Sequence, residues 1–147
     1  MRIAAAVLVL AACGSRRAAD DQKALRTEAQ VELNKLAKSL KAHWVEAGRF
    51  PIGTAAPLPA DPCCKGKHGR CGVTSAWHAD PVWKALRFDV LDAGHLQFAY
   101  ESDGTTATAR AIADLDCDGT TITFTLRVSV QDGTPRAVLD QPPLDAD

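Results

Sequence analysis

The sequence predicts one α+β domain in which a long N-terminal helix packs on an antiparallel β-sheet. Three observations lead to this fold class. Apolar residues recur every three or four positions in the first third of the chain, which is the period of a helix. In the last third apolar and polar residues alternate, which is typical of strands with one buried face. Between them lies a stretch rich in proline and cysteine, so we expect a disulfide-stapled loop between helix and sheet.

An apolar run at the N-terminus predicts a signal peptide over residues 1–12. The run is too short for a membrane span, which needs about 20 apolar residues. Arg2 supplies the positive charge, and small residues precede Cys13, as at a cleavage site. The sequence Leu10-Ala11-Ala12-Cys13 resembles the lipobox of bacterial lipoproteins, in which the cysteine thiol receives a diacylglycerol. We therefore expect Cys13 to be lipidated. The alternative is an ordinary secretory signal with a cysteine at its cleavage site.

The mature chain is expected to begin with a short tether and a long helix. Residues 13–21 are polar or small, which predicts a flexible tether between the lipid and a single domain over residues 22–147. A helix is predicted over residues 20–47, ending before Gly48 and Pro51. Its apolar stripe consists of Leu25, Ala29, Leu33, Leu36, Leu40 and Trp44.

The loop over residues 51–81 holds five of the eight prolines and three of the five cysteines. A secreted chain folds where disulfide bonds persist. With Cys13 lipidated, an even number of cysteines remains, which allows three pairings of two bridges. Bridged Cα atoms normally lie about 5.5 Å apart, so a bond between adjacent cysteines is the least favoured. Each neighbour is thus expected to pair outward, with the partners open. The four cysteines are Cys63, Cys64, Cys71 and Cys117.

Strands are predicted after this loop. A short helical turn near Pro81 precedes them, and they cover residues 95–102, 106–115, 121–130 and 136–139. In the second strand, alternate positions 107 to 113 are all alanine. Small side chains allow a close approach, so we expect the long helix to lie across this strand.

Two segments resemble type IV pilins and type II secretion pseudopilins. The run EAQVELNKLAKSLKAHWVEAGRFP resembles their helix where it enters the globular head, and ATARAIADLDCDGTTITFTL resembles their later strands. The resemblance implies a spine helix on an antiparallel sheet of about four strands, with a variable loop between them. It also implies that Cys63, Cys64 and Cys71 lie in that loop and that Cys117 lies in a turn between strands.

The N-terminus departs from the pilin pattern. Pilins carry a short basic leader, a glycine before the cleavage point, a glutamate five residues later and an apolar helix of about 20 residues. Here the sequence around Cys13 precedes a polar segment instead. We therefore expect a lipid-anchored accessory in the bacterial envelope, in contact with the bilayer through Cys13, rather than a filament subunit. Gly14 replaces the aspartate that retains many lipoproteins at the inner membrane, which favours the outer membrane.

An acidic segment gives one candidate cation site. Asp114, Asp116 and Asp118 match the opening of a calcium loop, but Thr125 replaces the glutamate at position twelve. A tight acidic turn is the favoured interpretation, and a weak calcium site is the alternative. The segment CCKGKHGRC combines cysteines with His68, although disulfide bonds explain its cysteines better than a zinc site does.

Charge and motifs favour a binding role over catalysis. The sequence carries no nucleophile elbow, no glycine-rich phosphate loop and no paired carboxylates at a recognisable site, which predicts a protein that is not an enzyme. A net charge of −1 gives no indication of a nucleic-acid partner. We expect protein contacts at the envelope through the stapled loop, possible partners being pilus or secretion-system proteins. The alternative is a lipoprotein that binds calcium or a small ligand.

Overall fold

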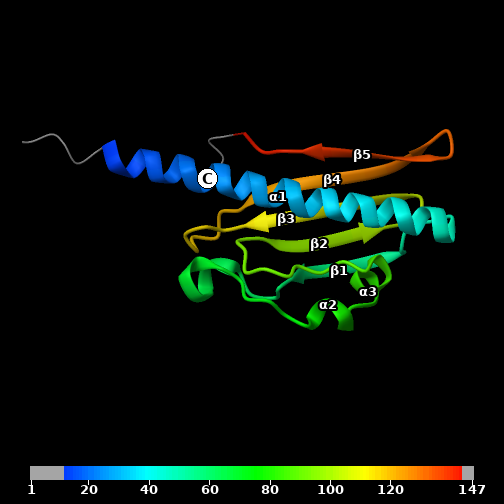
Figure 1. Ribbon diagram of the computed structural model, residues 1–147, viewed down its shortest axis with the longest axis horizontal. Coiled ribbons are helices and arrows are strands. Elements are labelled where there is room, and N and C mark those ends of the chain that lie inside the picture. The colour runs from blue at the N-terminus through cyan, green and yellow to red at the C-terminus, as the bar shows by residue number, and fades with distance from the viewer. Residues whose placement is uncertain (1–11, 144–147) are drawn as a thin grey trace, which may run out of the picture.

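The computed structural model describes residues 12–143, with side chains from Asp20 onward. One long helix lies on a five-stranded antiparallel sheet whose strand order follows the chain (Figure 1). The predicted α+β class is thereby confirmed. The strands are β1 (Gly53–Leu58), β2 (Gln97–Ser102), β3 (Thr106–Ala113), β4 (Ile122–Gln131) and β5 (Thr134–Asp140). The helices are α1 (Ala12–Ala47), α2 (Ala76–Ala79) and α3 (Pro81–Leu86), with 3-10 turns η1 (Cys63–Lys65) and η2 (Lys67–Gly69).

Helix α1 begins earlier than the sequence predicts. It starts at Ala12 instead of near Asp20, so the backbone over residues 13–21, expected to be a flexible tether, is helical. The physical reason is that no glycine or proline interrupts the chain between Gly14 and Gly48, while alanine and arginine favour helix. The predicted end is confirmed, because Gly48 takes a φ of 68° and donates its N–H to the Trp44 carbonyl at 2.8 Å.

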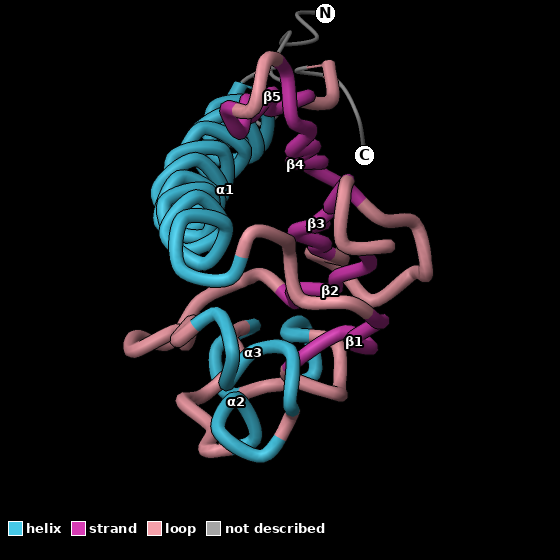
Figure 2. The backbone as a smooth tube through the Cα atoms, turned by 90° about the vertical axis from the view of Figure 1, so that its right-hand side faces the viewer, coloured by secondary structure: helices cyan, strands magenta, loops and turns pink. Residues whose placement is uncertain are grey.

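The apolar stripe of α1 forms one side of the main core. All its members from Leu25 to Leu40 are buried, and Trp44 packs against them while half-buried. The helix runs along one face of the sheet and contacts β3, β4 and β5 (Figure 2). The four alternate alanines of β3 are buried beneath it, as the sequence predicts. None of the described helices is long and apolar enough to cross a membrane.

Strand β1 is the main departure from the predicted sheet. The expected sheet had about four strands, and the segment after Pro51 was expected to be irregular. Instead β1 pairs antiparallel with β2, with an irregular register between Ala55 and Leu58. Pro57 fits because β1 is an edge strand, where a residue without an N–H is tolerated.

A second part of the core lies under α2 and α3. These short helices cover the β1 side of the same face that α1 covers (Figure 2). Trp77 and Trp83 meet edge to face, with ring centroids 5.4 Å apart. Asp80 caps α3 by accepting the Val82 N–H at 2.8 Å, and Pro81 occupies its first turn. The predicted helical turn at this position is confirmed.

We predict that Ala111→Leu destabilises the protein by about 1–3 kcal/mol, because the inner face of β3 has no room for a larger side chain. Urea unfolding measures the change. Thr108→Leu on the outer face of β3 is the matched control and should change the free energy of unfolding by less than about 0.5 kcal/mol. Equal stability of the two variants would show that α1 does not pack closely on this strand.

Candidate functional site

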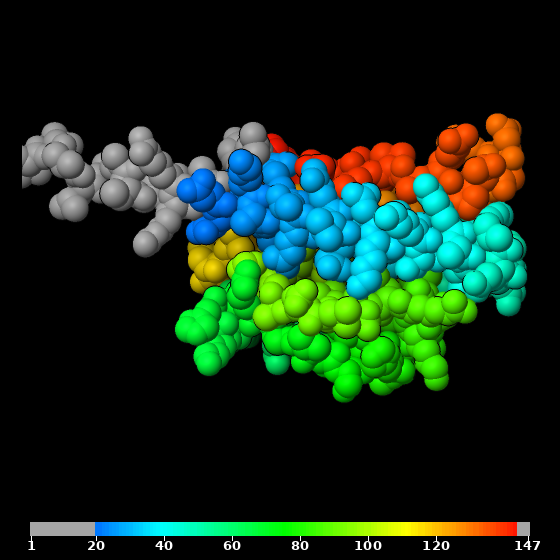
Figure 3. All heavy atoms as spheres, viewed as in Figure 1, coloured from blue at the N-terminus to red at the C-terminus, as the bar shows by residue number. Residues whose placement is uncertain are grey.

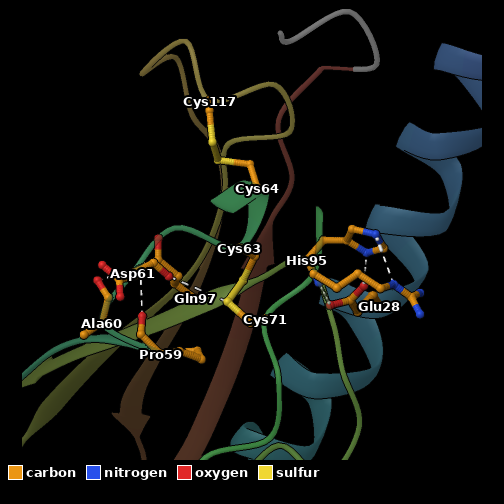
Figure 4. Close-up of a disulfide and its surroundings, with 11 residues drawn as sticks. Glu28, Pro59, Ala60, Asp61, Cys63, Cys64, Cys71, His95, Gln97 and Cys117 are labelled. Atoms are coloured by element: carbon orange, nitrogen blue, oxygen red, sulfur yellow. Dashed lines mark hydrogen bonds and ion pairs between the residues drawn. A yellow bond between two sulfur atoms is a disulfide. The ribbon is translucent and has the colours of Figure 1, made fainter. Parts of the chain in front are cut away.

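Two disulfide bonds define the candidate site. Cys63 bonds to Cys71 across eight positions, and Cys64 bonds to Cys117 across 53 positions. The expectation that the two neighbours pair outward is confirmed, and the partners left open by the sequence are now assigned. We call residues 59–72 the stapled loop; Figure 4 shows both bonds beside it.

Three connections fix the stapled loop to the sheet end. The bond to Cys117 joins it to the turn between β3 and β4. Cys71 and Gly94 exchange two backbone hydrogen bonds, of 2.7 Å and 3.2 Å. Gln97, the first residue of β2, donates its side-chain amide to the Pro59 carbonyl at 2.7 Å. The loop is thus held at both ends and in its middle.

A hydrogen-bonded chain links α1 to the stapled loop. Glu28 of α1 accepts the His95 backbone N–H at 2.8 Å and lies 2.9 Å from His95 Nδ1 (Figure 4). Arg70 Nε donates to His95 Nε2 at 3.3 Å. Since Nε2 accepts the hydrogen bond from Arg70, Nδ1 carries the ring hydrogen in this arrangement and donates a hydrogen bond to Glu28. Gly94 permits this approach, because a Cβ there would lie 2.3 Å from Glu28 Oε1.

Residues of the stapled loop line a groove that is open to solvent and has a volume of about 820 Å³. Its lining includes the segment from Pro59 to Pro62 and the exposed cations Lys65, Lys67 and Arg70. None of these cations has a carboxylate within 4.0 Å among residues whose side chains are described. The groove therefore presents unpaired positive charge to solvent.

The predicted acidic cluster forms, with its carboxylates turned toward backbone amides. Potential ligand oxygens of Asp114, Asp116 and Asp118 lie within 4.8 Å of one another. Asp114 accepts the Cys117 N–H at 2.7 Å through Oδ1 and the Gly119 N–H at 3.1 Å through Oδ2. The hydrogen bond from the Thr120 backbone lowers the pKa of Asp118. These bonds support a tight acidic turn.

A zinc site is not available at CCKGKHGRC. All three of its cysteines are in disulfide bonds and offer no thiolate. His68 is an exposed residue with a left-handed φ of 58°.

The predicted lipidation site lies at the start of α1. The backbone of Cys13 belongs to the first turn of the helix, and its side chain lies outside the described residues, as do residues 1–11 of the predicted signal peptide. This end of α1 extends beyond the sheet, on the side where the stapled loop lies (Figure 1).

Sequence reasoning missed the chain of Glu28, His95 and Arg70. Glu28 and His95 lie 67 positions apart, and no sequence pattern relates one to the other. Their contact depends on the fold, which brings the segment before β2 against α1.

Comparison with known proteins finds no family model that matches the chain, and neither a curated protein nor a solved structure matches it. The function therefore has to be inferred from the residues and from the fold described above.

We predict that calcium at about 5 mM leaves the melting temperature unchanged, because the carboxylates already accept backbone hydrogen bonds. A site with a dissociation constant of about 1 mM would instead add about 1 kcal/mol of stability and raise the melting temperature by about 3 °C. Scanning calorimetry measures the shift, with magnesium at the same concentration as a control. A calcium-specific rise that Asp116→Asn abolishes would establish the calcium site.

Proposed function

We propose that this protein is a non-catalytic lipoprotein of the bacterial cell envelope, anchored through Cys13, whose pilin-like domain acts by protein contacts at the stapled loop. The observation that carries the proposal is the pair of disulfide bonds around this exposed loop. Disulfide bonds persist outside the cytoplasm, in agreement with a cleaved signal at residues 1–12.

The anchor would act at the projecting end of α1. Three acyl chains on a mature N-terminal Cys13 hold a protein firmly at a bilayer, because each buried methylene contributes about 0.8 kcal/mol. A domain held in this way remains beside the membrane, facing the periplasm or the exterior. The outer membrane is the proposed location, since Gly14 follows the cysteine.

The pilin-like assignment is supported by the arrangement of the domain. A spine helix packs on β3, β4 and β5, and the disulfide-bonded loop lies between this helix and the later strands. Pilins and pseudopilins combine the same parts. The proposed partners are accordingly components of a type IV pilus or a type II secretion system, which the protein would contact as a tethered accessory.

A contact role is supported by how firmly the stapled loop is held. Binding through a flexible loop costs entropy because the loop must be ordered, whereas a loop closed by two covalent bonds loses less freedom. The groove also presents charges that no described side chain neutralises. Such a surface suits recognition of a partner.

Calcium binding is the second candidate function. It is favoured by the close approach of the Asp114, Asp116 and Asp118 carboxylates. The calcium titration above separates the two candidates.

Metabolic labelling with a fatty-acid probe tests the anchor. We predict that the wild-type chain incorporates the probe in a bacterial host and that Cys13→Ser loses all incorporation. Ser15→Ala leaves the thiol in place and should be labelled like the wild type. An unlabelled wild-type chain would favour the ordinary secretory signal, and a labelled Cys13→Ser chain would place the lipid elsewhere.

A further inference from the structure

A tight backbone arrangement brings the residues that carry the cations of the stapled loop close together in the chain path. Gly66 packs against the Arg70 carbonyl so closely that a Cβ would lie 1.9 Å from its oxygen. Gly66 also donates its N–H to the Cys63 carbonyl at 2.9 Å. The backbone flanking Gly66 is therefore close to Arg70, and Lys65, Lys67 and Arg70 line one groove.

These cations differ from several others on the surface. Arg87 lies 3.5 Å from Glu46, and Arg110 lies 2.6 Å from Glu101, so their charges are partly neutralised. The three groove cations have no such partner among the described side chains. Arg70 is oriented through the bond from its Nε to His95, which leaves its terminal nitrogens to receive a ligand.

We propose that this groove binds a carboxylate-rich peptide segment of a protein partner, which deepens and rests on the proposed contact function. Lys65, Lys67 and Arg70 receive its carboxylates, and the apolar rings of Pro59 and Pro62 line the same groove. Asp61, which also lines the groove, repels excess negative charge and accepts a peptide N–H. The site thus distinguishes a peptide from a simple anion.

The surroundings of the groove favour a peptide over an anionic membrane. The bond between Cys64 and Cys117 holds the acidic turn next to the stapled loop, at the same end of the molecule (Figure 3). A flat anionic bilayer that approached this end would meet Asp116 and Asp118, both exposed, together with the cations. A peptide that enters the groove contacts the cations without covering the acidic turn.

Fluorescence anisotropy with a labelled peptide of alternating glutamate and glycine tests the proposal. The full-length lipidated protein is used in neutral detergent micelles. We expect Lys65→Gln combined with Lys67→Gln to weaken binding at least about fivefold, and added salt to weaken wild-type binding. The matched control combines Lys38→Gln with Lys41→Gln, which removes the same charge from exposed positions on α1 and should leave the affinity within about twofold.

Three results would overturn the proposal: no peptide binding by the wild type at low salt, equal loss in the two double variants, or displacement of the peptide by an equal concentration of inorganic phosphate. A separate experiment measures binding of the Cys13→Ser chain to phosphatidylglycerol vesicles. Vesicle binding that depends on Lys65 and Lys67, without peptide binding, would assign the groove to the membrane instead. The fatty-acid labelling experiment tests the anchor at Cys13 independently of the peptide assay. A failure of the peptide proposal can therefore be distinguished from a failure of the lipoprotein proposal.

Discussion

The two disulfide bonds are the constraint on which the candidate site depends. The stapled loop has little regular structure of its own, only two 3-10 turns and the isolated pairing of Cys71 with Gly94. Cross-linking Cys64 to Cys117 over 53 positions removes entropy from the unfolded chain worth about 4 kcal/mol, and the bridge over eight positions adds about 2.5 kcal/mol. A loop rich in proline and glycine can therefore keep a fixed groove without a hydrophobic core beneath it.

The bridges position the loop because they attach it to strands that are themselves packed against α1. Cys117 lies in the turn that joins β3 to β4, the strands on which α1 packs. The leucine stripe and the alanine face thus hold the strands that carry one disulfide partner. A second connection runs from Glu28 of α1 to His95, and from His95 to Arg70 of the stapled loop. The packing of the helix and the position of the groove cations are consequently parts of one connected structure.

The sequence predicted features that depend on local periodicity. The leucine stripe of α1, the alternation in β3 and β4, and the outward pairing of Cys63 and Cys64 follow from spacing alone. The predicted start of α1 was wrong because small polar residues are compatible with a flexible tether as well as with a helix. Strand β1 was missed because GTAAPL contains a proline and is stabilised by pairing with β2, forty or more positions away. The groove and the chain from Glu28 to Arg70 were missed for the same reason, since only the fold brings these residues together.

The most direct test of this arrangement is disulfide mapping of protein isolated from the envelope, with free thiols blocked and without reduction. We predict that tryptic digestion releases one cluster of three linked peptides, which contain Cys63 with Cys64, Cys71 and Cys117. Fragmentation between Cys63 and Cys64 should leave Cys71 on the first cysteine and Cys117 on the second. Blocked thiols at all four positions, or a bond from Cys63 to Cys117, would contradict both the stapled loop and the groove built on it.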